Sequence, residues 1–174
     1  MTRTRSLQTM IGEGKRGRVR RWIIPATLAI ALLLTALPVP SWAVPYRPDW
    51  VGVVLIYWCI ATPHRVGAGV GWLVGMVMDA MQFTLLGQNA LAKTVLAFAA
   101  NQFHLRIRMY PMWQQCIVVL ILLSIDIGLV MWIHGISHNI AVRWWAWWPA
   151  VTSMLIWPWA FVILRDARRR VHLR

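Results

Sequence analysis

The sequence predicts an all-α integral membrane protein, folded as a compact bundle of six transmembrane helices with both termini in the cytoplasm. Three observations support this prediction. Of the 174 residues, 59% are hydrophobic and only 13% are charged, whereas a water-soluble fold needs roughly a quarter of its residues charged. Long apolar runs alternate with short polar stretches. The basic residues lie between these runs and at the two ends, rather than over a folded surface.

The chain divides into three parts in order. Residues 1–21 contain seven Lys or Arg among Gly, Ser and Thr, a composition typical of a disordered cytoplasmic tail. Residues 22–164 contain the transmembrane domain, and residues 165–174 form a second basic cytoplasmic tail. We expect the six spans at residues 22–37, 50–62, 66–86, 89–103, 112–133 and 147–164.

Residues 50–62 are the weakest of these spans, because 13 residues fall short of the usual minimum of about 17. The basic residues favour keeping this span. With six spans, 15 of the 18 Lys and Arg residues lie on the inner side, only Arg47 and Arg143 face out, and Lys93 is intramembrane. This asymmetry follows the positive-inside rule. It accounts for the net charge of +13 without a nucleic-acid partner, and it lets the tails contact anionic membrane lipids.

The first apolar run has an alternative interpretation as a secretory signal. Basic residues precede it, and Ser41 and Ala43 occupy the two small-residue positions that signal peptidase reads. Cleavage there would leave the orientation of the remaining chain unchanged.

The third run carries a regular pattern of glycines. Gly67, Gly71 and Gly75 recur every four residues, and Asp79 follows at the next interval. Positions four apart share one face of a helix. Glycines let another backbone approach closely, so we expect this face to be buried against protein. A lone charge within the bilayer costs at least about 2.5 to 3.5 kcal/mol, so Asp79 needs a partner.

Lys93 and Asp126 are the intramembrane groups expected at a similar depth to Asp79. If the outer turn centres near Gly87, all three side chains fall in the outer half of the bundle. We therefore predict an intramembrane polar cluster of Asp79, Lys93 and Asp126. Two interpretations stay open: a satisfied network that fixes helix register, or a path for ions or protons.

Catalytic and metal-binding patterns are missing from the sequence. It contains no G-x-S-x-G, no H-E-x-x-H and no P-loop, and it has no soluble domain that could house a conventional enzyme. His134 and His138 have metal-ligand spacing, but Gly135 interrupts them and no third ligand is apparent. We expect no enzymatic activity, no metal and no cofactor.

A series of short motifs resembles the rod shape-determining protein MreD family. The series runs in order over nearly the whole chain: ArgProAspTrp at 47–50, TyrTrp at 57–58, ProHisArgVal at 63–66, the glycine-spaced run ending in Asp79, LeuGly at 86–87, TrpGlnGln at 113–115, and TrpProTrp at 157–159 before a basic tail. Lys93 lies outside the family pattern, and the basic N-terminal tail is longer than usual.

The resemblance implies a non-enzymatic component of the cell-wall elongation complex in the bacterial inner membrane. Such a protein would help maintain cell shape by binding MreC and coupling the MreB cytoskeleton to peptidoglycan synthesis. RodZ, RodA and a penicillin-binding transpeptidase belong to the wider complex. The face of Gly67, Gly71, Gly75 and Asp79 would then either hold the bundle together or receive a partner helix such as that of MreC.

A different class of function suits six spans of this length as well. A small-molecule transporter subunit, resembling the substrate-binding component of a vitamin uptake system, would also bury carboxylates. It would need a substrate-sized polar cavity under an ordered outer lid, and its ligand would raise its thermal stability.

Overall fold

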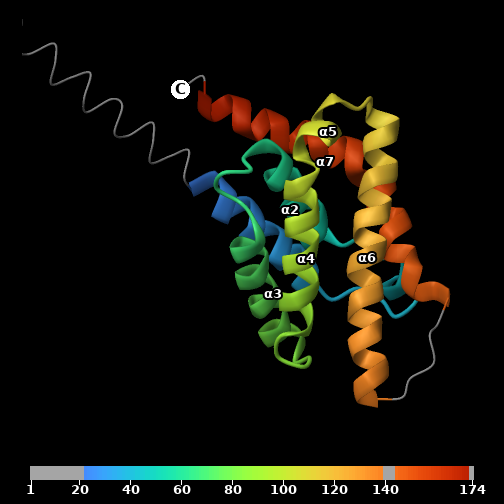
Figure 1. Ribbon diagram of the computed structural model, residues 1–174. Coiled ribbons are helices and arrows are strands. Elements are labelled where there is room, and N and C mark those ends of the chain that lie inside the picture. The colour runs from blue at the N-terminus through green and yellow to red at the C-terminus, as the bar shows by residue number, and fades with distance from the viewer. Residues whose placement is uncertain (1–21, 139–143, 173–174) are drawn as a thin grey trace, which may run out of the picture.

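The computed structural model describes residues 22–138 and 144–172, and within these ranges all regular secondary structure is helical (Figure 1). The predicted all-α fold is therefore confirmed for this part of the chain. The predicted disordered tail at residues 1–21 lies outside the described residues. The elements are an N-terminal helix at Trp22–Ala36, η1 at Val44–Tyr46, α2 at Trp50–Ala61, α3 at Ala68–Gln82, α4 at Gln88–Gln102, α5 at His104–Met109, α6 at Met112–His138, η2 at Trp144–Trp147 and α7 at Trp148–His172.

Helix α2 forms the centre of the bundle. Nine of its 12 residues are buried, and its apolar residues point in every direction rather than along one stripe. The N-terminal helix, α4, α5, α6 and α7 all pack around it. Trp58 in α2 donates from Nε1 to the Thr27 hydroxyl at 2.8 Å, which fixes the N-terminal helix against this core.

Two helices in the described residues are long and apolar enough to cross a membrane, Met112–Ile136 and Trp145–Arg169. In each, only 22% of the most apolar stretch is buried within the bundle, so these are not the covered core helices of a soluble protein. Helices α2, α3 and α4 have 12, 15 and 15 residues, which span only about 18 to 22 Å. That the chain crosses the membrane six times therefore stays a prediction.

Most helices begin close to their predicted positions. The differences occur at helix ends and at α5, which forms in a stretch predicted to lie between two spans. Helix α6 starts at residue 112 as expected and continues to His138. Helix α7 continues to His172, through most of the segment predicted as a basic tail. The run predicted at 66–86 is shortened to Ala68–Gln82, because Phe83 adopts a left-handed conformation with φ of 51°.

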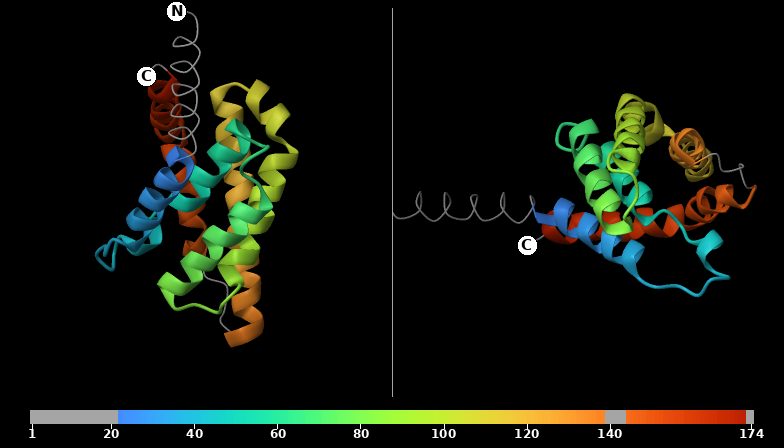
Figure 2. Two further views of the ribbon diagram at one scale, coloured as in Figure 1. Left: turned by 90° about the vertical axis from the view of Figure 1, so that its left-hand side faces the viewer. Right: turned by 90° about the horizontal axis from the view of Figure 1, so that it is seen from below.

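The start of the N-terminal helix and the last turns of α7 lie at the same end of the bundle, and the turn between α3 and α4 lies at the opposite end (Figure 1 and Figure 2). Ile23 and Arg168 line one cavity, which places the two ends of the described chain together. This arrangement is compatible with an even number of membrane crossings.

Candidate functional site

A buried ion triad joins three helices near the start of α2. Lys93 of α4 pairs with Asp126 of α6, with 2.6 Å between Nζ and Oδ2, and it pairs with Asp49 as well. The side chains of Lys93, Asp126 and Asp49 are 2%, 4% and 15% exposed. We call these three residues the Lys93 triad. Lys93 and Asp126 were predicted to lie together, and the structure brings them together.

Asp49 is the member of the triad that the sequence prediction missed. It is the N-cap of α2, where its Oδ1 accepts from the Gly52 backbone N–H at 2.9 Å. Its own backbone N–H donates to the Ser153 hydroxyl of α7 at 2.8 Å. Asp49 therefore ties α7 to the triad that already joins α2, α4 and α6.

The physical effect of the triad follows from its burial. A buried ion pair adds little net stability over a well-packed apolar equivalent, but removing one partner strands an unpaired charge and costs about 3 to 5 kcal/mol. The triad thus disfavours any register in which α2, α4 and α6 do not bring these three side chains together.

Asp79 was predicted to share this cluster, and that part of the prediction is wrong. Asp79 forms no ion pair in the described chain, and its carboxylate points into the turn that follows α3. It accepts five hydrogen bonds of 2.9 to 3.2 Å, from the Thr84 hydroxyl, the backbone N–H groups of Gly87, Asn89 and Ala90, and the Asn89 side-chain amide.

The course of the chain explains this position. Helix α3 ends three residues after Asp79, and the backbone turns through Phe83 and through Gly87, whose φ is +101°. This turn carries the first N–H groups of α4 onto the carboxylate, where a helix has donors without intrahelical partners. Asp79 therefore caps α4 from the preceding helix.

The glycine face of α3 packs against α4. A Cβ added at Gly71 would lie 2.5 Å from the Lys93 carbonyl oxygen, and one at Gly75 would lie 2.5 Å from the Asn89 carbonyl oxygen and would meet the Ala90 backbone. Gly67 is less tightly packed, with Asn101 at 3.6 Å from its added Cβ. Of the two expectations for this face, holding the bundle together is the one that its contacts support.

These contacts connect the glycine face to the triad. The backbone of Lys93 rests against Gly71, while its side chain reaches Asp49 and Asp126. Because α4 already covers Gly71 and Gly75, the face is closed to a partner helix unless α4 moves away.

Comparisons with known proteins agree with the resemblance found in the sequence. A family model described as rod shape-determining protein MreD matches residues 16–167. The chain is 30% identical over 156 residues to the rod shape-determining protein MreD of Haemophilus influenzae, and the match covers 89% of this chain and 96% of that protein. No solved structure matches. All three residues of the Lys93 triad, and Asp79, lie within the region matched by the family model.

Proposed function

This chain belongs to the family of the rod shape-determining protein MreD, and we propose that it is a non-enzymatic membrane scaffold of the cell-wall elongation complex. Family membership supports a role in determining rod shape. In our proposal the protein crosses the bacterial inner membrane six times, binds MreC, and helps to couple MreB to peptidoglycan synthesis. RodZ, RodA and a penicillin-binding transpeptidase would complete the wider complex.

The scaffold proposal rests on the bonding partners of the two intramembrane carboxylates, Asp79 and Asp126. Asp126 pairs with Lys93 between α6 and α4, and Asp79 is saturated by the donors of the α3–α4 turn. Groups with such fixed partners hold helices in place, and they are poorly suited to transferring protons or gripping a substrate. A rigid bundle suits a protein whose task is to position others.

The proposed orientation is supported by where the basic residues gather. Arg65, Arg108 and Arg168 come from separate parts of the chain, yet they line one cavity at the end of the bundle where the described chain begins and ends. The positive-inside rule assigns such an end to the cytoplasm. The turn between α3 and α4 then faces the periplasm.

The contacts of α3 limit where MreC can bind. Since α4 occupies Gly71 and Gly75, a helix of MreC would pack against an outward-facing surface instead. Leucine at Gly71 and Gly75 would then disrupt the bundle itself, rather than remove a docking site.

Depletion in a rod-shaped host tests the proposal. We expect cells to become round when the protein is depleted and to regain rod shape when this chain is supplied from a plasmid. Affinity purification of the tagged full chain in mild detergent should recover MreC. Cells that keep their rod shape but starve for one nutrient would contradict the proposal and favour the transporter alternative, which also predicts a rise in thermal stability with that nutrient.

A further inference from the structure

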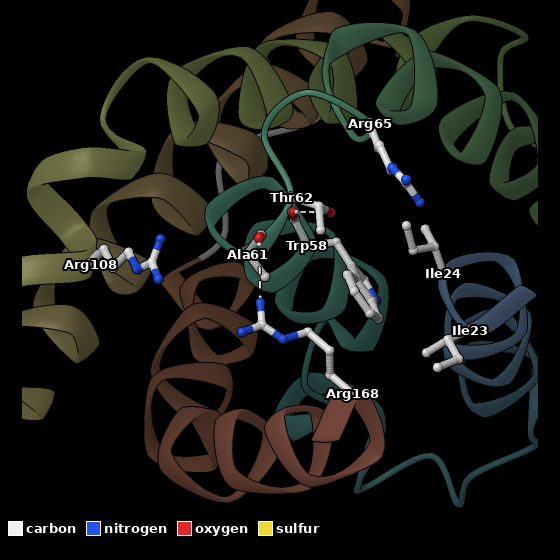
Figure 3. A pocket seen from close by; sticks show the side chains of 8 residues that line it. All are labelled: Ile23, Ile24, Trp58, Ala61, Thr62, Arg65, Arg108 and Arg168. Atoms are coloured by element: carbon white, nitrogen blue, oxygen red, sulfur yellow. Dashed lines mark hydrogen bonds between the residues drawn. The ribbon is translucent and has the colours of Figure 1, made fainter. Parts of the chain in front are cut away.

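A basic cavity of about 300 Å³ lies at the end of α2 opposite the Lys93 triad. Three arginines from different parts of the chain line this space: Arg65 from the α2–α3 connection, Arg108 from α5 and Arg168 from α7. Figure 3 shows Arg168 reaching Ala61 at the end of α2, with Arg65 on one side of it, near Ile24, and Arg108 on the other. The other lining residues are Ile23, Ile24, Trp58, Ala61 and Thr62.

A second, smaller cavity of about 90 Å³ adjoins the first. It shares Ala61, Arg108 and Arg168 with the larger one, and it adds a fourth arginine, Arg165. Tyr57 and Phe161 contribute aromatic walls, and their rings pack edge to face. The two cavities therefore form one basic region with apolar sides.

The positive charge of this region is not neutralised by the described part of the chain. Both ion pairs found there belong to Lys93, at the other end of α2. Among the four arginines, one hydrogen bond is formed, from Nη1 of Arg168 to the Ala61 carbonyl oxygen at 3.4 Å. That bond caps the last turn of α2 and uses one of the five N–H donors of a guanidinium. Most donors of all four groups remain available.

Guanidinium groups gathered around a cavity match the geometry of a phosphate, which accepts paired hydrogen bonds from their planar forks. The apolar walls next to them, Ile23, Ile24 and Trp58, suit hydrocarbon rather than a fully soluble anion. Trp22 and Leu105, on the two helices that contribute Ile23 and Arg108 to the cavity, are 68% and 66% exposed. A molecule with a phosphate and an acyl chain fits both features.

We propose that this cavity binds the head group of an anionic phospholipid, with the phosphate at Arg168 and with Arg65 and Arg108 flanking the head group on its two sides. In the proposed orientation the cavity lies at the cytoplasmic face, where basic pockets between helices bind anionic lipid head groups. The bound lipid would bridge the N-terminal helix, α5 and α7, all of which line this cavity.

Purified full-length protein in a neutral detergent provides the test. Thermal unfolding is followed while phosphatidylglycerol, or phosphatidylcholine with the same acyl chains, is added. We expect phosphatidylglycerol to raise the melting temperature by several degrees, since a ligand of the native state stabilises it by mass action, and phosphatidylcholine to have little effect. Inorganic phosphate and glycerol phosphate are titrated separately, as anions without acyl chains. If only these anions raise the melting temperature, the cavity is a site for a free anion and the lipid proposal is wrong.

Matched arginine variants locate the site. Arg65→Gln and Arg108→Gln remove charges that make no hydrogen bond to the described chain, so the fold should survive, and each should weaken the phosphatidylglycerol response roughly tenfold in lipid concentration. Arg106→Gln and Arg169→Gln are the controls, because these exposed arginines lie on α5 and α7 outside both cavities. Equal weakening by all four variants would mean that only net charge matters, and the proposed site would be wrong. The assay uses purified protein, so its outcome is separate from that of the cell-shape experiment.

Discussion

Lys93 of α4 and Asp126 of α6 are ion-paired at 2.6 Å, although 33 residues separate them in the sequence. Asp49 reaches the same ammonium group from the start of α2. Lys93 and Asp126 are almost completely buried, so neither could turn to water if its partner were lost. The pair therefore makes the packing of α4 on α6 specific.

Replacing the central cation should destabilise the bundle strongly. Lys93→Met leaves Asp126 buried without its partner, and we expect the free energy of unfolding to fall by about 3 to 5 kcal/mol. Reversible denaturation in detergent micelles measures this loss. Arg169→Met is the control for removing a positive charge, because Arg169 is exposed on α7. Equal stability of the two variants would contradict the structural role of the triad.

Asp79 should stabilise the protein by holding the α3–α4 turn. Asp79→Ala removes the acceptor of five hydrogen bonds and leaves N–H groups of α4 without partners, so we expect a loss of at least about 3 kcal/mol. Thr84→Ala removes only one of these bonds and should cost about 1 kcal/mol. The same denaturation assay compares them, and a larger loss from Thr84→Ala would show that Asp79 does not organise the turn.

Two glycines of α3 provide a matched test of its packing against α4. The added methyl of Gly75→Ala would collide with the backbone at Ala90, and overpacking of this kind costs about 1 to 3 kcal/mol. Gly69→Ala lies on the same helix and meets nothing within 4 Å, so it should leave stability unchanged or slightly higher. If both variants melt at the same temperature, α3 and α4 do not pack as closely as described.

The proposed topology predicts opposite labelling at the two ends of the bundle. In a background with Cys59 and Cys116 replaced by alanine, a cysteine at Phe83, which is 96% exposed beside the outer turn, should react with a membrane-impermeant maleimide added to intact spheroplasts. A cysteine at Arg106 should react only after the membrane is permeabilised. Labelling of both cysteines from the same side would contradict the placement of these two ends on opposite faces of the membrane, and labelling of the Arg106 position in intact spheroplasts would contradict a cytoplasmic α5.

Hydrophobicity and charge were sufficient to predict the helical fold and most helix positions. Helix α4 was expected at residues 89–103 and occurs at Gln88–Gln102, and α6 begins at Met112 as expected. Apolar runs specify where helices form because backbone groups buried in hydrocarbon must be hydrogen-bonded within the segment. Depth along the helices also predicted that Lys93 and Asp126 would meet.

The errors at the site share one cause, which is the geometry of chain turns. Asp79 was assigned to the polar cluster by helical periodicity, but α3 stops at Gln82, and the turn supplies nearer donors. Asp49 was not included in the predicted cluster, although an aspartate directly before an apolar run is a recognised N-cap signal. The three arginines of the basic cavity come from three separate parts of the chain, so no local pattern could have indicated it.

In the proposed function, the Lys93 triad serves the fold of a shape-determining scaffold and performs no ion or proton chemistry. A triple variant with Asp49→Asn, Lys93→Met and Asp126→Leu removes all three charges together, keeps an N-cap acceptor on α2, and avoids an unpaired buried ion. The decisive measurement is cell shape after depletion of the wild-type protein, with the amount of folded variant measured in the same cells. The scaffold account predicts that the triple variant accumulates and restores rods, whereas Lys93→Met alone is lost and leaves cells round. A triple variant that accumulates normally while the cells stay round would contradict it.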